Sequence, residues 1–164
     1  MSQKLKEQSL SPEMQAAALG APAIAEPLDF SDLDDRIRRA LHAASEKKAI
    51  DPTVLDLRGI ATFTDFFVIC TGGNRRQVQA IADEVVDQLK RHGSPASRVE
   101  GYQNAEWVLI DYGDFVVHVF DDKARRFYDL ERLWREAGRL NPSSEQIESQ
   151  ISRMKSEEGS LREA

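Results

Sequence analysis

The sequence predicts an α/β fold in which a mixed sheet of about five strands is flanked by helices. Segments with apolar residues at helical spacing alternate with short runs that are rich in Val, Ile and Phe. The run at residues 65–71 is apolar on both faces, which is typical of a strand covered by helices on both sides. A length of 164 residues with 41% hydrophobic residues suits one domain with its own core.

The first helix is expected over residues 32–48. Ser31 and Asp34 have the spacing of a capping box, with Asp where Glu or Gln is usual. Apolar residues follow at helical spacing, and the helix has to end before Pro52, because the residue that precedes a proline avoids the helical region. Residues 1–30 are rich in proline and contain few large apolar side chains, so we expect a disordered arm there.

Two strands and a second helix are expected next. The strands are predicted over residues 54–60, where apolar and polar residues alternate, and over residues 65–71. The turn Gly72-Gly73 then leads into a helix that Asn74 can cap and that ends at His92 and Gly93.

The stretch from residue 98 to residue 120 is predicted to supply the remaining strands. Residues 106–112 alternate, Gly113-Asp114 fits a two-residue hairpin turn, and residues 115–120 return as a central strand. Because side chains alternate along a strand, two opposite faces are expected: Trp107, Leu109 and Asp111 on one, and Val108, Ile110 and Tyr112 on the other.

A last helix is expected from Asp121-Asp122 to Gly138. Its apolar side consists of Phe127, Leu130, Leu133, Trp134 and Ala137. Apolar residues become sparse after Asn141, so residues 141–164 are expected to form a disordered or frayed tail. The predicted folded domain therefore spans residues 31–140.

Acidic residues and aromatic residues are mixed in the central stretch. From residue 98 to residue 122 the one Lys or Arg is Arg98, against six carboxylates: Glu100, Glu106, Asp111, Asp114, Asp121 and Asp122. Such a strip suits a basic protein partner and repels nucleic-acid phosphate, so little direct nucleic-acid contact is expected. The alternative is a solvated hairpin whose aromatic residues belong to the core, and this alternative includes Trp107.

Other features exclude several classes of protein. Cys70 is the only cysteine, so no disulfide can form within the chain, which fits a reducing cytoplasm. No run of apolar residues is long enough to span a membrane. The three histidines show no metal-ligand spacing, and His118 is interpreted as a hydrogen-bonded core or interface residue rather than as a ligand or base.

The turn Gly72-Gly73 offers a second hypothesis, a nucleotide-binding protein or a nucleotidyltransferase-like enzyme. A strand, a glycine turn and a capped helix are the right context for binding phosphate. The turn matches neither the Walker loop nor G-x-G-x-x-G, and no pair of carboxylates follows it on a strand to hold Mg²⁺ on a triphosphate. We therefore expect no enzyme activity and no cofactor or metal, with the glycines serving geometry.

Several of these segments together resemble the ribosomal silencing factor, or Iojap, family. The similar region covers roughly residues 34–138. Its motifs start at Asp65 (DFFVIC), Val78 (VQAIA), Glu100 (EGY), Glu106 (EWVLIDYGD), Val116 (VVHVF) and Arg126 (RFYDLERLW). The chain departs from the family at residues 72–75, where Gly-Gly-Asn-Arg stands in place of the usual Gly-Asn-Ser, which leaves any role of that turn in doubt.

The resemblance implies a nucleotidyltransferase-like fold without the catalytic carboxylates. It also implies a cytoplasmic translation repressor that binds a basic large-subunit ribosomal protein, number fourteen in ribosomal nomenclature. Bound there, it blocks joining of the small subunit when nutrients are scarce. A homodimer is expected when the protein is free, and a large-subunit assembly factor remains an alternative. The binding residues carried over are Trp107, Leu109, Asp111, Tyr112 and Asp114, with Glu100, Tyr102 and His118 near them.

Overall fold

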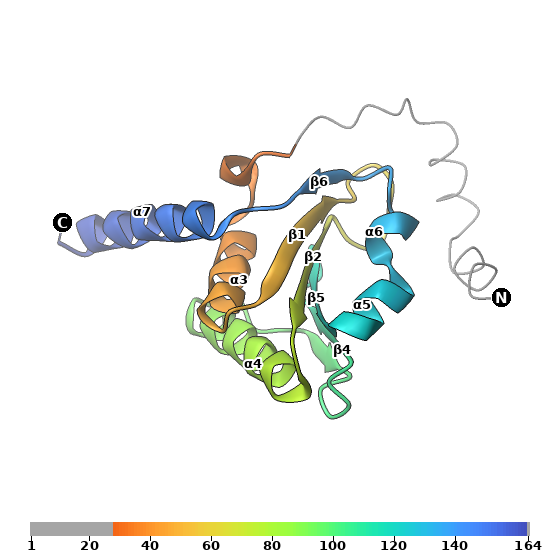
Figure 1. Ribbon diagram of the computed structural model, residues 1–164. Coiled ribbons are helices and arrows are strands. Elements are labelled where there is room, and N and C mark those ends of the chain that lie inside the picture. Colours follow the sequence, from red (N-terminus) through yellow and green to blue (C-terminus); the bar gives the residue numbers. More distant parts are fainter. Residues whose placement is uncertain (1–27, 164) are drawn as a thin grey trace.

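A six-stranded mixed sheet with helices on both faces forms the centre of the molecule, shown in Figure 1 as a computed structural model that describes residues 28–163. The strand order is β3-β4-β5-β2-β1-β6. The strands are β1 (Ile50–Asp56), β2 (Phe66–Gly72), β3 (Arg98–Glu100), β4 (Trp107–Asp111), β5 (Phe115–Asp121) and β6 (Gly138–Leu140). Strands β2 and β5 are parallel and the other neighbours are antiparallel. The predicted fold class is confirmed, with one strand more than expected.

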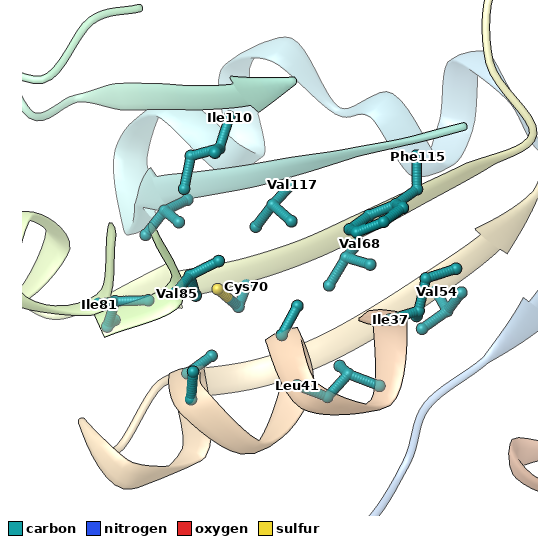
Figure 2. Packing of buried hydrophobic residues seen from close by; sticks show 14 of the residues in the cluster. Ile37, Leu41, Val54, Val68, Cys70, Ile81, Val85, Ile110, Phe115 and Val117 are labelled. Carbon is teal, nitrogen blue, oxygen red and sulfur yellow. The ribbon is translucent and has the colours of Figure 1, made fainter. Parts of the chain in front are cut away.

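Helices α3 (Asp35–Glu46) and α4 (Arg75–Arg91) cover one face of the sheet (Figure 1). Their apolar sides meet the inward residues of the central strands, as Figure 2 shows for Ile37 and Leu41 of α3 and Val85 of α4. Cys70 is fully buried in this cluster, and burial raises the pKa of its thiol to about 12. The lone cysteine is therefore a core residue, as the sequence indicates.

The opposite face carries the shorter helices α5 (Asp122–Tyr128) and α6 (Leu130–Leu133). A second buried cluster lies there, and it contains Phe67, Phe120 and Trp134. Trp107 and Leu109 of β4 pack against the margin of this cluster and stay only partly buried. This side of β4 is thus the part of the sheet that the helices leave incompletely covered.

The N-terminal boundary differs from the expectation. Residues 1–27 of the predicted arm lie outside the described residues, but Leu28 and Phe30 are buried in the core. The carboxylate of Asp29 caps a short 3-10 turn, η1 (Phe30–Asp32), by accepting from the Ser31 N–H. Because this turn comes first, Asp34 is the cap of α3 and accepts from the Arg36 N–H at 2.8 Å. The expected capping box starting at Ser31 is therefore wrong.

Strand β1 begins and ends earlier than predicted. Asp51 adopts a positive φ of 49°, and the pairing with β2 shifts register between Ile50 and Thr53, which accommodates Pro52 within the strand. The strand ends at Asp56, whose carboxylate accepts from the Arg58 N–H at 3.0 Å and so starts a turn.

The single last helix expected before Gly138 is two helices and a strand. Asp129 adopts the left-handed conformation, with φ of 45°, and separates α5 from α6. Gly138 then begins β6, which pairs with β1, instead of ending a helix. The break also takes Phe127 off the buried side on which it was expected, and its side chain is 62% exposed.

The C-terminal residues form helix α7 (Ser144–Glu163), so the expectation of a disordered or frayed tail does not match the structure. The side chain of Gln146 accepts from the Ser143 N–H, and the Ser143 hydroxyl accepts from the Gln146 N–H, which is a reciprocal cap. Ile147 is buried in the same cluster as α3, and Figure 1 shows α7 running past α3 and away from the sheet. No helix within residues 28–163 is both long and apolar enough to cross a membrane.

We predict that Ile147→Ala lowers the free energy of unfolding by about 2–4 kcal/mol, because truncating a fully buried Ile removes apolar contact and leaves a cavity. Glu148→Ala is the matched control, because Glu148 is the next residue along α7 and is exposed. It should change the free energy of unfolding by less than about 0.5 kcal/mol. Urea unfolding of both variants measures the difference. Equal midpoints would show that α7 does not pack on α3.

We also predict an acid-sensitive contribution from His118, which is 3% exposed. Burial lowers the pKa of its imidazole from 6.5 to about 3. In the unfolded chain His118 becomes protonated below about pH 6.5, whereas in the folded protein it stays neutral until about pH 3. The free energy of unfolding therefore falls as the pH drops from 6.5 toward 3. By pH 5 the unmodified protein should have lost about 2 kcal/mol more of its free energy of unfolding than His118→Asn. Urea unfolding of both proteins at a series of pH values measures this difference. Parallel profiles for the two proteins would contradict this assignment.

Candidate protein-binding face

The strand pairing brings several predicted residues to one side of the sheet. Glu100 of β3 lies opposite Leu109 of β4, and Arg98 lies opposite Asp111, so these side chains share a face with Trp107. We call the surface formed by Glu100, Trp107, Leu109, Asp111 and Tyr128 the β4 face. It lies beside α5, at the margin of the second buried cluster.

Trp107 is the central aromatic residue of the β4 face. Its ring centroid lies 5.1 Å from that of Phe120 and 4.6 Å from that of Tyr128. Its indole N–H donates to Nδ1 of His118 at 3.0 Å. The polar group of the indole is thus satisfied within the protein, and the surface that remains for a partner is ring carbon.

Tyr128 is a surface residue that the sequence reasoning missed. Its side chain is 38% exposed, and its ring also contacts Phe127 at a centroid distance of 5.0 Å. The two residues stand at the end of α5, and they extend the apolar surface of Trp107 beyond the strand. The signal was present in the family-like motif that starts at Arg126, but no binding role was assigned to its aromatic pair.

The carboxylates of the β4 face are only loosely neutralised. Arg98 lies 3.6 Å from Glu100 and 3.6 Å from Asp111, and its side chain is more than half exposed. Asp111 also accepts from the Gly113 N–H at 2.8 Å, which fixes its carboxylate at the start of the hairpin turn. Exposed ion pairs of this length contribute little stability, so a cation from a partner can replace Arg98 at small cost.

Tyr112 and Tyr102 do not belong to this surface. Tyr112 is buried on the opposite face, where its ring stacks on Phe115 at 4.8 Å and burial raises the pKa of its hydroxyl to about 12. Tyr102 faces α4, since its hydroxyl donates to Asp83 at 2.9 Å. Both residues support the first core cluster, and neither lies on the β4 face.

Asp114 and His118 do not lie on the exposed β4 face either. Asp114 lies at the hairpin turn, where its carboxylate is 2.5 Å from the guanidinium of Arg36 on α3. His118 shares the face of Trp107 but is buried beneath it, between Phe67 and Phe120. Of the eight predicted residues, Glu100, Trp107, Leu109 and Asp111 are brought together, and His118 supports them.

The Gly72-Gly73 turn is occupied by contacts within the protein. A Cβ on Gly72 would lie 2.8 Å from the backbone nitrogen of Val78, so glycine is needed for the close approach of β2 to α4. The Gly73 N–H donates to the side chain of Gln77 at 2.6 Å, and the Gln77 N–H donates to the cap residue Asn74 at 2.8 Å. These donors are therefore not available to a phosphate.

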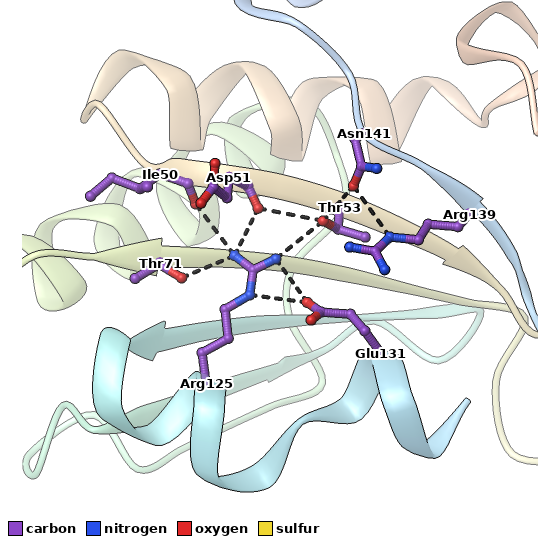
Figure 3. A network of polar contacts seen from close by, with 8 residues as sticks. All are labelled: Ile50, Asp51, Thr53, Thr71, Arg125, Glu131, Arg139 and Asn141. Carbon is purple, nitrogen blue, oxygen red and sulfur yellow. Dashed lines mark hydrogen bonds and ion pairs between the residues drawn. The ribbon is translucent and has the colours of Figure 1, made fainter. Parts of the chain in front are cut away.

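A separate hollow of about 750 Å³ lies where β2 and β5 end, and Figure 3 shows the polar network beside it. Arg125 of α5 donates to the Asp51 carbonyl at 2.7 Å and to the Thr71 hydroxyl at 2.9 Å, and it pairs with Glu131 at 2.8 Å. The guanidinium thus joins α5 and α6 to β1 and β2. Within the described part of the chain, no group of three or more His, Cys, Asp or Glu side chains is arranged to hold a metal ion.

Comparison with known proteins gives consistent matches. A family model described as "Ribosomal silencing factor during starvation" matches residues 31–164. The ribosomal silencing factor RsfS of Halalkalibacterium halodurans is 46% identical over 101 residues, which are 62% of this chain and 86% of that protein. The protein of the same name from Bacillus subtilis is 45% identical over the same shares. "Mitochondrial assembly of ribosomal large subunit protein 1" of Mus musculus is 30% identical over 92 residues, 54% of this chain and 40% of that protein.

Solved structures agree with the sequence matches. A crystal structure from Bacillus halodurans aligns with a TM-score of 0.59 at 42% identity, covering 66% of this chain and 98% of that one. A structure from Chromobacterium violaceum aligns with a TM-score of 0.61 at 34% identity, covering 71% and 92%. Since the family model extends across nearly all of the described residues, the chain belongs to the ribosomal silencing factor family.

Proposed function

We propose that this protein represses translation by binding the large ribosomal subunit through a basic ribosomal protein, number fourteen, and by keeping the small subunit from joining. The observation that carries the proposal is the β4 face, where a partly buried Trp107 shares one side of the sheet with the carboxylates of Glu100 and Asp111. The family name, with its reference to silencing during starvation, supplies the context of nutrient limitation.

The β4 face has the chemistry of a protein interface. Trp107, Leu109 and Tyr128 offer apolar area that a partner can desolvate, and aromatic anchors of this kind carry most of the energy of many interfaces. Glu100 and Asp111 add carboxylates where β3 pairs with β4, and Arg98 between them neutralises only part of their charge. Negative charge there attracts Lys and Arg side chains and repels ribosomal RNA phosphate. Binding is therefore expected to weaken as the salt concentration rises.

The proposed mechanism is steric and needs no catalysis. The backbone N–H groups of Gly73 and Gln77 already donate to side chains of the protein itself. This observation gives no support to the nucleotide-binding hypothesis. A folded domain fixed over the joining surface excludes a second large body simply by its volume. The homodimer of the free protein stays a prediction, because the β4 face accounts for one partner only.

A second candidate function is large-subunit assembly. It is favoured by one observation, the 30% identity to the mouse protein named for mitochondrial assembly of the ribosomal large subunit. Such a factor would use the same β4 face on a precursor particle. The two functions differ in whether a mature large subunit with the factor bound still accepts the small subunit.

We predict that Trp107→Ala weakens binding to isolated large subunits by more than about 1 kcal/mol, which is more than about fivefold in Kd. Phe63→Ala is the control, because Phe63 is an aromatic residue with a 52% exposed side chain that lies outside the β4 face. Phe63 precedes β2, whereas Trp107 pairs with Phe120 near the end of β5. Co-sedimentation over a range of protein concentrations gives both constants. Normal binding by folded Trp107→Ala would remove the β4 face from the proposal.

We predict that saturating protein lowers the yield of joined ribosomes when small subunits are added to large subunits. The proposed block needs the domain to stay bound, so at a protein concentration near the wild-type Kd, where a binder weakened about fivefold is mostly free, Trp107→Ala should restore joining. Density-gradient profiles of the mixtures measure the effect. Co-migration with the large subunit together with undiminished joining would contradict steric exclusion and favour the assembly function.

A further inference from the structure

The contact between Trp107 and His118 links the proposed binding surface to the buried part of the sheet. Trp107 lies opposite Phe120, and His118 lies opposite Leu109, so the indole and the imidazole are diagonal neighbours on one face of β4 and β5. The indole Nε1 lies 3.0 Å from Nδ1 of His118. We propose that His118 is a positioning residue that fixes the orientation of the Trp107 indole, and this inference rests on the function proposed above.

The hydrogen bond defines the chemical form of His118. An indole N–H can only donate, so Nδ1 of His118 has to be the acceptor and the neutral imidazole carries its proton on Nε2. The side chain is 3% exposed, and Phe67 lies against it at a centroid distance of 4.4 Å. Water therefore does not compete for the acceptor, and the bond is maintained in a buried environment.

The other ring nitrogen indicates that the imidazole is not there for packing. Nε2 is buried and has no hydrogen-bond partner among the described residues. A buried donor without a partner is unfavourable, and an apolar side chain in the same place would avoid this cost. An apolar side chain could fill the same space, but only a hydrogen-bond acceptor at this position can bind the indole N–H of Trp107.

A fixed indole suits the proposed contact. The rings of Phe120 and Tyr128 pack against the indole of Trp107. His118 accepts the hydrogen bond from its one polar group, the indole N–H. The ring is thus presented to the partner in one orientation, with no hydrogen bond to exchange on docking. Because immobilising a side chain on binding has an entropic cost, loss of this arrangement should weaken binding roughly three- to tenfold.

His118→Val and His118→Asn separate positioning from general stability. Valine removes the acceptor, whereas the asparagine side-chain oxygen can take the place of Nδ1. The readouts are the Kd for large subunits and the indole N–H resonance of Trp107, which Trp107→Phe distinguishes from that of Trp134. We expect the valine variant to show a shifted, faster-exchanging indole N–H and the weaker Kd, and the asparagine variant to stay near wild type in both.

Several results would overturn the inference. One is a wild-type Kd for His118→Val while Trp107→Ala binds weakly, and this leaves the proposed function intact. If Trp107→Ala itself binds normally, the binding surface is wrong and the positioning role falls with it. The nitrogen chemical shifts of His118 in the unmodified protein test the geometry without any substitution, so a variant that fails to fold does not block the test. A proton on Nδ1 would exclude the hydrogen bond.

Discussion

The parallel pairing of β2 with β5 determines where the other elements lie. It extends over the full length of both strands, from Phe66 opposite Phe115 to Gly72 opposite Asp121. Parallel neighbours need a long crossover, which here consists of α4, β3 and β4. Helix α4 covers one face together with α3, while only the short helices α5 and α6 follow β5 onto the other. The unequal cover leaves one side of β4 available for a partner.

The alternation of side chains along β4 could be predicted from the sequence, because every second residue of this strand points into the core. Trp107 and Leu109 lie on one face and Tyr112 on the other, as that pattern predicts. The same pattern argued against Tyr112 as a binding residue, so its inclusion followed the family-like motif rather than the geometry. The break at Asp129 could not be predicted, because a left-handed aspartate has no distinct sequence signal. The Ser143 and Gln146 pair that caps α7 was a readable signal that was overlooked.

Charge counted along the sequence differs from charge displayed on the surface. Asp121 accepts from the Ala124 N–H at 2.7 Å and caps α5, and Asp114 pairs with Arg36 on α3. These carboxylates are used to connect elements of the fold. The acidic character of the β4 face then rests on Glu100 and Asp111, with Arg98 between them. A long acidic strip in the sequence therefore becomes two carboxylates on the β3 and β4 side of an aromatic centre.

The position of Tyr128 depends on polar contacts at some distance from it. Helix α5 has seven residues, and Ala124 is its one buried residue, so apolar packing alone holds it weakly against the sheet. Arg125 replaces that packing with a guanidinium bound to the Asp51 carbonyl and the Thr71 hydroxyl, as Figure 3 shows. Glu131 pairs with this partly buried guanidinium at 2.8 Å and so compensates its charge. The aromatic part of the β4 face is thus built from two directions: His118 holds Trp107 from within the sheet, and Arg125 holds the helix that carries Tyr128.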